Sequence, residues 1–216
     1  MKQEFSQINI NIFDRFALEY DEWFDNNRFA YLSEIEAVRR FIPSTGIGIE
    51  IGGGTGRFTE PLRIKIVVEP AEGMVQIAKS HGITVIRALA EQLPFADSSI
   101  DYALMVNVIC FLSDPLTALK EVRRILKEDG RIIIAIIDKE SQLGRKYEHS
   151  EGSNKFYSQA VFYSTQQVKE FLNSLNFQHI QICQTIFNDV NAMVKPDTVL
   201  EGHGKGGFVV LSGIKG

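Results

Sequence analysis

The segment between residues 46 and 69 constrains the fold of this chain more than any other part of the sequence. A short apolar run ends in the acid Glu50, and glycines follow at positions 52, 53, 54 and 56. Such a run is typical of a buried strand that turns tightly into a helix. A second apolar run, Ile64 to Val68, ends in another acid, Glu69. The pattern predicts two neighbouring strands, each with a carboxylate at its carboxyl end.

This arrangement suits a ligand that contains a nucleoside. Glycines let the backbone approach the ligand, and an acid on the second strand can accept hydrogen bonds from both ribose hydroxyls. Two common nucleotide motifs fail on spacing. A dinucleotide fingerprint needs a glycine where Arg57 stands, and a phosphate-binding loop needs Gly-Lys-Ser or Gly-Lys-Thr, which the chain lacks. A glycine-rich turn without a ligand is the alternative.

Composition favours one ordinary globular domain over residues 1–216, because a single core is still efficient at this length. No apolar stretch approaches the roughly 18 residues that span a bilayer, and the N-terminus lacks the apolar segment of a secretory signal. We therefore expect no membrane partner and a cytoplasmic location. The formal net charge of -4 makes a nucleic-acid partner unlikely.

Cysteine and histidine spacing gives no sign of a metal. Cys110 and Cys183 both lie in apolar runs, which predicts buried free thiols. His81, His149 and His179 show no paired ligand spacing, so no metal site is expected.

Apolar periodicity and turn residues predict alternating strands and helices, which favours a doubly wound α/β sheet. Ser33 with Glu36 forms a capping box that predicts the start of a helix, and Pro43 ends it. The expected strands cover residues 46–51, 65–68, 83–87, 100–106, 131–137, 177–186 and 207–213. The other expected helices are a short one after the glycines and longer ones at 70–82, 114–130 and 164–175.

The motif Glu50-x-Gly52-x-Gly54-x-Gly56 resembles the first motif of class I S-adenosylmethionine-dependent methyltransferases, among which the chain is similar to the type 11 group. The segments 100–115 and 126–134 also resemble stretches of that family, so the resemblance covers residues 46–138. It implies a Rossmann-like sheet of seven strands in the order 3-2-1-4-5-7-6, with strand seven antiparallel and helices on both faces. It also implies S-adenosylmethionine as the cofactor.

The resemblance assigns parts of the cofactor to individual residues. Gly52 and Gly54 would lie against its methionine and ribose portions, Glu50 would bind the methionine ammonium, and Glu69 would bind the ribose diol. In parallel sheets ligands bind outside the carboxyl ends of the strands, so Ala90, Glu91 and Asn107 are expected at the same cleft.

The stretch after the third strand departs from the family. Ala88 to Phe95 resembles the family's Asp-Ala-Glu-x-Leu-Pro-Phe, whose leading acid contacts the adenine amino group, but that place is held by Leu89. Adenine would then depend on the backbone of Ala90 or on Glu91. A solvated helix charge is an equally good interpretation of Glu91.

The remaining segments should choose the methyl acceptor. Residues 1–45 are rich in aromatics and form a helical segment that either covers the sheet edge or closes over the cofactor as a lid. Residues 46–138 form the expected cofactor half, and residues 139–216, with polar loops at 139–160 and 188–206, the substrate-side half.

A catalytic base is needed only if the acceptor must lose a proton, so the catalytic residues stay unknown. The candidates are residues that we expect at the mouth of the cleft, namely Tyr20, Asn107, Asp138, Tyr163 and His203. Structural roles are the alternatives, since Asp138 can cap a strand, Tyr163 can pack against a helix and His203 can lie on a flexible loop.

We expect a methyltransferase that acts on a small molecule. The Asn-Pro-Pro-Tyr type motif of nucleic-acid amino methyltransferases is missing after the fourth strand, where Asn107 to Cys110 stands. The alternatives are a non-catalytic module that binds S-adenosylmethionine and a methyltransferase for proteins or peptides. The sequence does not predict the oligomeric state.

Overall fold

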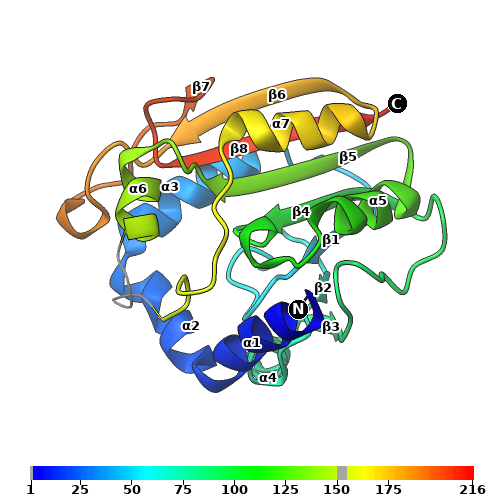
Figure 1. Ribbon diagram of the computed structural model, residues 1–216, viewed down its shortest axis with the longest axis horizontal. Helices are drawn as coiled ribbons and strands as arrows, with labels where there is room; N and C mark the ends of the chain where they lie inside the picture. The colour runs from blue at the N-terminus through cyan, green and yellow to red at the C-terminus, as the bar shows by residue number, and fades with distance from the viewer. Residues whose placement is uncertain (1, 150–154) are drawn as a thin grey trace.

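The computed structural model describes the backbone of residues 2–149 and 155–216, and the side chains of these residues except 2–6. The described strands form one sheet of eight strands (Figure 1). They are β1 (Gly48–Ile51), β2 (Ile66–Val68), β3 (Thr84–Ile86), β4 (Ile100–Val106), β5 (Leu126–Ile137), β6 (Phe177–Thr185), β7 (Leu200–Glu201) and β8 (Phe208–Lys215).

The strand order is β3-β2-β1-β4-β5-β8-β6-β7. The first five strands are parallel, and β8 lies antiparallel between β5 and β6. Because β8 is the strand that was numbered seven from the sequence, the predicted order and the antiparallel strand are confirmed. The two-residue β7, paired with β6, adds an edge strand that the sequence did not predict.

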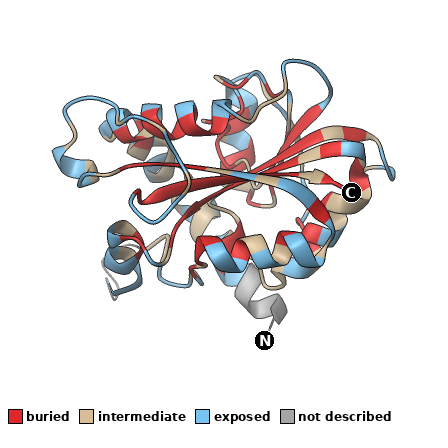
Figure 2. Cartoon of the chain, turned by 90° about the horizontal axis from the view of Figure 1, so that it is seen from above, coloured by how far each residue is buried: buried red, intermediate tan, exposed pale blue. Residues whose placement is uncertain are grey.

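Helices cover both faces of the sheet, as expected for a Rossmann-like α/β fold. They are α1 (Lys2–Arg15), α2 (Ala17–Asn26), α3 (Arg28–Arg39), α4 (Glu72–Ser80), α5 (Pro115–Ile125), α6 (Gln142–His149) and α7 (Thr165–Ser174), with short 3-10 turns η1 (Ile109–Phe111) and η2 (Val190–Ala192). Side chains alternate along β5, so Ile132 and Ile134 pack with α5 and α7 while Ile133 and Ala135 pack with α2 and α3. Figure 2 shows the buried residues gathered in the central strands and on the inward sides of the helices.

Three local predictions were wrong. Ser33 does not start a helix, because α3 begins at Arg28 and the Ser33 hydroxyl donates to the carbonyl of Phe29, one turn earlier. Residues 53–63 form successive turns instead of a short helix, since few residues remain before β2. The helix α5 ends at Ile125, because β5 already starts at Leu126 and extends the expected strand towards the N-terminus.

Other local predictions are confirmed. Asp114 caps α5 by accepting from the backbone N–H of Thr117, and Ser164 with Gln167 forms the predicted capping box of α7. The 139–160 segment contains α6, and its residues 150–154 lie outside the described part of the chain. Cys110 and Cys183 are buried free thiols. Within the described residues, no helix has the length and apolar character needed to cross a membrane.

Candidate functional site

A cavity lies at the carboxyl ends of the parallel strands, where the sheet order reverses between β1 and β4. In Figure 1, α1 and α2 run below the sheet and α6 lies beyond the ends of β4 and β5. The sheet side of the cavity is lined by Ile51, Gly52, Gly54, Phe58, Val68, Glu69, Pro70, Met74, Ala88, Leu89, Ala90, Glu91, Val106, Asn107, Val108, Phe111, Leu112 and Ile137. The outer side is lined by Asn9, Ile10, Phe13, Tyr20, Trp23, Phe24, Glu34, Leu143, Tyr147, Phe156, Tyr157 and Val190.

Two of the motif glycines form the cavity floor. Gly52 and Gly54 have φ of 66° and 55°, a left-handed conformation that glycine adopts without steric penalty. A Cβ atom at position 52 would lie 2.5 Å from Val108, and one at position 54 would lie 3.3 Å from Tyr20. Gly56 does not line the cavity, because its backbone packs against Ile83, where a Cβ would lie 2.1 Å from the side chain. Gly56 therefore closes the turn from behind.

Glu69 at the end of β2 is held by backbone amides. Its carboxyl oxygens accept from the N–H of Gly54 at 3.0 Å and of Ala71 at 2.9 Å. Burial raises the pKa of Glu69 to about 7, although both hydrogen bonds favour the charged form. A carboxylate offers about four acceptor positions, so two remain for a ligand in the cavity.

Glu50 takes a different place from the one predicted. Its side chain is buried, accepts a hydrogen bond from the Thr59 hydroxyl and does not line the cavity. Burial raises the pKa of Glu50 to about 8, and the nearby charge of Glu69 adds to this rise. The carboxyl therefore supports the glycine turn from below.

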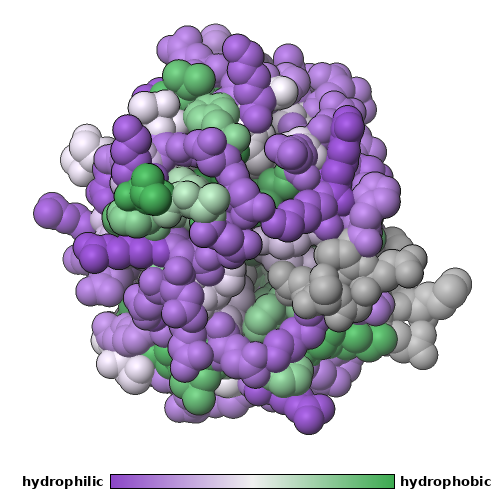
Figure 3. Space-filling view, turned by 90° about the vertical axis from the view of Figure 1, so that its left-hand side faces the viewer, coloured by the Kyte–Doolittle hydropathy of each residue, from purple (hydrophilic) through white to green (hydrophobic). Residues whose placement is uncertain are grey.

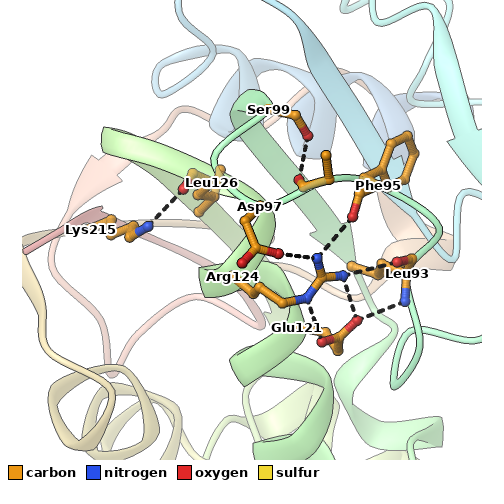
Figure 4. Close-up of polar contacts among 9 residues, drawn as sticks. Leu93, Phe95, Asp97, Ser99, Glu121, Arg124, Leu126 and Lys215 are labelled. Carbon is orange, nitrogen blue, oxygen red and sulfur yellow. Dashed lines mark hydrogen bonds and ion pairs between the residues drawn. The ribbon is translucent and has the colours of Figure 1, made fainter.

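The segment after β3 forms one wall of the cavity through Ala88 to Glu91. Glu91 accepts a hydrogen bond from the Ser113 hydroxyl at 3.2 Å, which turns it towards η1. Further along, the Arg124 guanidinium donates to the carbonyls of Leu93 and Phe95 and pairs with Asp97 (Figure 4). These contacts fix the wall to α5.

Two asparagines bring unsatisfied acceptors to the cavity. Asn107, at φ of 53° after β4, and Asn9 of α1 each have a buried side-chain oxygen with no hydrogen-bond partner among the described residues. The Asn9 amide nitrogen donates to the carbonyl of Phe111 at 3.3 Å, so its oxygen is the acceptor that is left. Buried polar atoms of this kind are rare in proteins unless a ligand or water completes them.

Aromatic side chains of the N-terminal segment line the cavity. Tyr20, Trp23 and Phe24 of α2 line it, and Phe156 packs against Tyr20 with ring centroids 5.8 Å apart. The helix α2 is tied to the glycine turn by Arg57, which pairs with Asp21 at 2.6 Å and Asp25 at 2.7 Å. Arg57, which stands where a dinucleotide fingerprint would need a glycine, thus positions α2 next to the cavity.

Glu34 is a site residue that the sequence analysis missed. It lies on α3, is 6% exposed and lines the cavity. Its carboxyl has no hydrogen bond or ion pair within the part of the chain that the structure describes. Burial raises the pKa of Glu34 to about 8. A helical pattern with Ala30, Ile35 and Val38 buried could have placed Glu34 on the inner face, but no motif marked it.

Three predicted catalytic candidates lie outside the cavity. Asp138 accepts from the Thr165 hydroxyl at 2.6 Å and from the N–H of Glu140 at 3.0 Å, so it joins the end of β5 to α7. Tyr163 packs against Phe171, and His203 is exposed on the turn between β7 and β8. Of the five candidates, Tyr20 and Asn107 line the cavity.

Comparisons with known proteins identify the family. A family model described as a methyltransferase domain matches residues 49–134. A Thermotoga maritima protein, described as a SAM-dependent methyltransferase and possible histamine N-methyltransferase, is 47% identical over 96% of this chain and 100% of its own, with a TM-score of 0.93. The chain belongs to the S-adenosylmethionine-dependent methyltransferases. Its methyl donor is S-adenosylmethionine.

Two further relatives extend the comparison. The uncharacterized protein MJ1123 of Methanocaldococcus jannaschii is 47% identical over 206 residues, which cover 95% of this chain and 100% of that protein. A SAM-dependent methyltransferase of Archaeoglobus fulgidus is 16% identical over 91% of this chain and 99% of its own, with a TM-score of 0.69, and is similar in fold alone.

The cavity of this methyltransferase fits the donor. Glu69 leaves acceptor positions for a diol, Gly52 and Gly54 line the cavity without side chains, and Asn9 and Asn107 carry unsatisfied acceptors. Within the described residues, no group of three or more His, Cys, Asp or Glu side chains could hold a metal ion. The outer face on the side of α6 is mostly hydrophilic, with small separate hydrophobic areas (Figure 3).

Proposed function

We propose that this methyltransferase transfers a methyl group to a small-molecule acceptor. The observation that supports the proposal most is one cavity with two different ends. Glu69 and the glycine turn lie at one end, where Tyr20 of α2 meets Gly54, and further aromatic side chains from α2, α6 and residues 156–157 line the other. Such enclosure suits a small acceptor better than a folded protein. The Thermotoga maritima relative, described as a possible histamine N-methyltransferase, also supports a small acceptor.

The residues of the cavity would act by positioning. S-adenosylmethionine supplies a methyl group that is already activated on a sulfonium, so alignment and exclusion of water are the protein's main contributions. Glu69 would accept from the ribose hydroxyls, Gly52 and Gly54 would let the backbone lie against the ligand, and Glu50 would support their turn. Ala90, Glu91 and Asn107 would bound the nucleoside.

The helix α2 would close the site. Tyr20 and Trp23 form part of the cover, and burial raises the pKa of Tyr20 far above its usual value, so its hydroxyl stays protonated at neutral pH. The cover would keep water away from the sulfonium while the acceptor is aligned. Residues 1–45 would in this way serve as the lid of the cofactor half.

Calorimetry with S-adenosylhomocysteine tests the cofactor site. Glu69→Ala should weaken binding about 1000-fold, because two hydrogen bonds to a charged group, each about 2 kcal/mol, are lost. Glu72→Ala, which removes an exposed acid of α4 paired with Arg87, is the matched control and should change the affinity less than twofold. Equal binding by Glu69→Ala and the wild type would show that the donor does not lie at the glycine turn.

Turnover tests the reaction. The wild type should release S-adenosylhomocysteine with at least one compound from a panel of small amines, alcohols and thiols. Turnover with lysate proteins alone would favour a protein or peptide methyltransferase. Binding of the donor without any turnover would favour the non-catalytic module.

A further inference from the structure

The described lining of the cavity is acidic and includes no basic group. The lining side chains include Glu34, Glu69 and Glu91, whereas Lys, Arg and His are absent from the described residues that line it. Glu69 is held by two amides and Glu91 by a hydroxyl, but Glu34 has no partner within the described residues. A buried carboxylate without a partner is unfavourable by several kcal/mol. In the free protein burial therefore favours the neutral acid of Glu34, with a pKa of about 8, and a cationic group beside it would favour the carboxylate.

Aromatic rings from several segments line the same cavity as Glu34. Trp23 and Phe24 come from α2, Tyr147 from α6, and Tyr157 stacks on Tyr147 with ring centroids 4.9 Å apart. Burial raises the pKa of Tyr147 and Tyr157, and the charge of Glu34 raises both further, which places its carboxyl near these rings. Ring faces attract cations, by about 0.5–2 kcal/mol each. A carboxylate enclosed by rings is a binding site for an ammonium group.

From this geometry we infer that the methyl acceptor is a small amine, whose ammonium group binds to the Glu34 carboxylate between aromatic side chains. The inference rests on the proposed function, because the amine reacts only when the methyl donor occupies the other end of the cavity. Anionic acceptors are disfavoured there, since no basic group of the described lining would neutralise them.

Binding also prepares the nitrogen for attack. The ammonium gives one proton to the Glu34 carboxylate, and the neutral amine keeps a free electron pair. That pair forms a nitrogen–carbon bond to the transferred methyl while the carbon–sulfur bond breaks and its electron pair passes to sulfur. The product leaves as a methylated ammonium ion, and Glu34 releases its proton to water.

The other ionisable groups near Glu34 keep their charge state during this step. Tyr20 of α2, Tyr147 of α6 and Tyr157 are phenols whose pKa burial raises, so they stay neutral. Burial raises the pKa of Glu34 to about 8, which lets it hold a proton near neutral pH. Glu69 also titrates near pH 7 but lies at the cofactor end. Because Glu69 titrates in the same pH range, substitution of Glu34 distinguishes its role from that of Glu69 better than a pH profile alone.

The test is calorimetry of the full chain saturated with S-adenosylhomocysteine. The probes are the amine, the alcohol and the carboxylate of three skeletons: phenylethyl, imidazolylethyl and n-butyl. At least one amine should bind ten times more tightly than its alcohol, and its carboxylate should not bind. Glu34→Gln should weaken amine binding at least tenfold and change the affinity for S-adenosylhomocysteine less than twofold. Glu36→Gln, an exposed acid on the same helix, should change neither.

Methyl transfer adds a second measurement. The rate of Glu34→Gln should recover as pH rises and free amine becomes available, which a purely structural role would not produce. If no amine binds better than its matched alcohol, or if Glu34→Gln binds amines like the wild type, the inference is wrong. If S-adenosylhomocysteine fails to bind the wild type, the proposed function fails instead.

Discussion

The two ends of the cavity each contain a buried acid, and the two acids differ in how they are held. At the cofactor end, Glu69 accepts hydrogen bonds from the amides of Gly54 and Ala71. At the outer end, Glu34 has no partner within the described residues. The first site is therefore organised before a ligand arrives. At the second site burial keeps the acid protonated at neutral pH, and a cationic ligand would favour its ionised form.

The two acids differ because one site is built from a continuous segment of the chain and the other from segments distant in sequence. Glu69 and its amide donors belong to one continuous segment, from the glycine turn to the start of α4, so local backbone geometry builds the site. The outer end is assembled from two distant parts of the chain, α2 with α3 and α6 with residues 156–157. We expect the cofactor end to be sensitive to backbone changes and the outer end to changes of charge.

The largest expected effect is on stability. Between pH 4.5 and about 8 the folded protein keeps the Glu34 proton while the unfolded chain loses it, so stability falls as pH rises through this range. Glu34→Gln should remove that penalty and raise the free energy of unfolding at pH 8 by about 4 kcal/mol. Near pH 4.5 the gain should vanish. Urea denaturation at the two pH values measures it.

Glu36→Gln is the control for this experiment. Its exposed side chain should give a difference below about 0.5 kcal/mol at both pH values. If Glu34→Gln is no more stable than the wild type at pH 8, a hydrogen bond or ion pair stabilises the Glu34 carboxylate. Glu34 and Glu69 would then not differ in how they are held.

A smaller effect is expected at the glycine turn. Gly54→Ala should weaken binding of S-adenosylhomocysteine about tenfold, because the added Cβ approaches Tyr20 and reduces the space in the cavity. Gly82→Ala is the matched control: it has a similar positive φ of 76°, but no atom lies within 4 Å of the new Cβ. Both variants should lose about 1 kcal/mol of stability, whereas binding should fall only for Gly54→Ala. Thermal unfolding measures the backbone strain that both variants share, and calorimetry measures the effect of the new Cβ on ligand binding.

The smallest effect is expected at His203. This side chain is exposed and outside the cavity, so His203→Ala should change donor affinity and turnover less than twofold. Steady-state kinetics with an accepted substrate checks this. A loss of turnover above tenfold would mean that the 188–206 loop, whose Val190 already lines the cavity, also brings His203 to the outer end.

Much of the fold could be predicted because its signals are local. The apolar runs ending in Glu50 and Glu69, the cap at Asp114 and the capping box at Ser164 all correspond to observed elements. Ser33 misled the prediction because a serine three residues before a glutamate also occurs inside helices. Its hydroxyl there bonds to the preceding turn and accepts from the N–H of Asp197, a partner distant in sequence.

The candidate site could be predicted only in part. Gly52, Gly54 and Glu69 line the cavity, and their motif placed them there. Glu50 was expected in the cavity as well, but spacing says nothing about the Thr59 hydroxyl that holds its carboxyl below the turn. Asp138 ends a strand as predicted, yet its side chain points to Thr165 of α7.

The sequence by itself predicted the glycine turn from the spacing of its glycines, and its resemblance to a known family implied the sheet order and the methyl donor, because short runs of residues carry that resemblance. Only the tertiary structure decided which side chains face the donor and what lies opposite it. Glu34, Asn9 and Tyr147 line one cavity from three different helices, and no local sequence pattern predicts that they lie together. Burial of an acid without a partner is a property of packing, which exists only when the chain has folded.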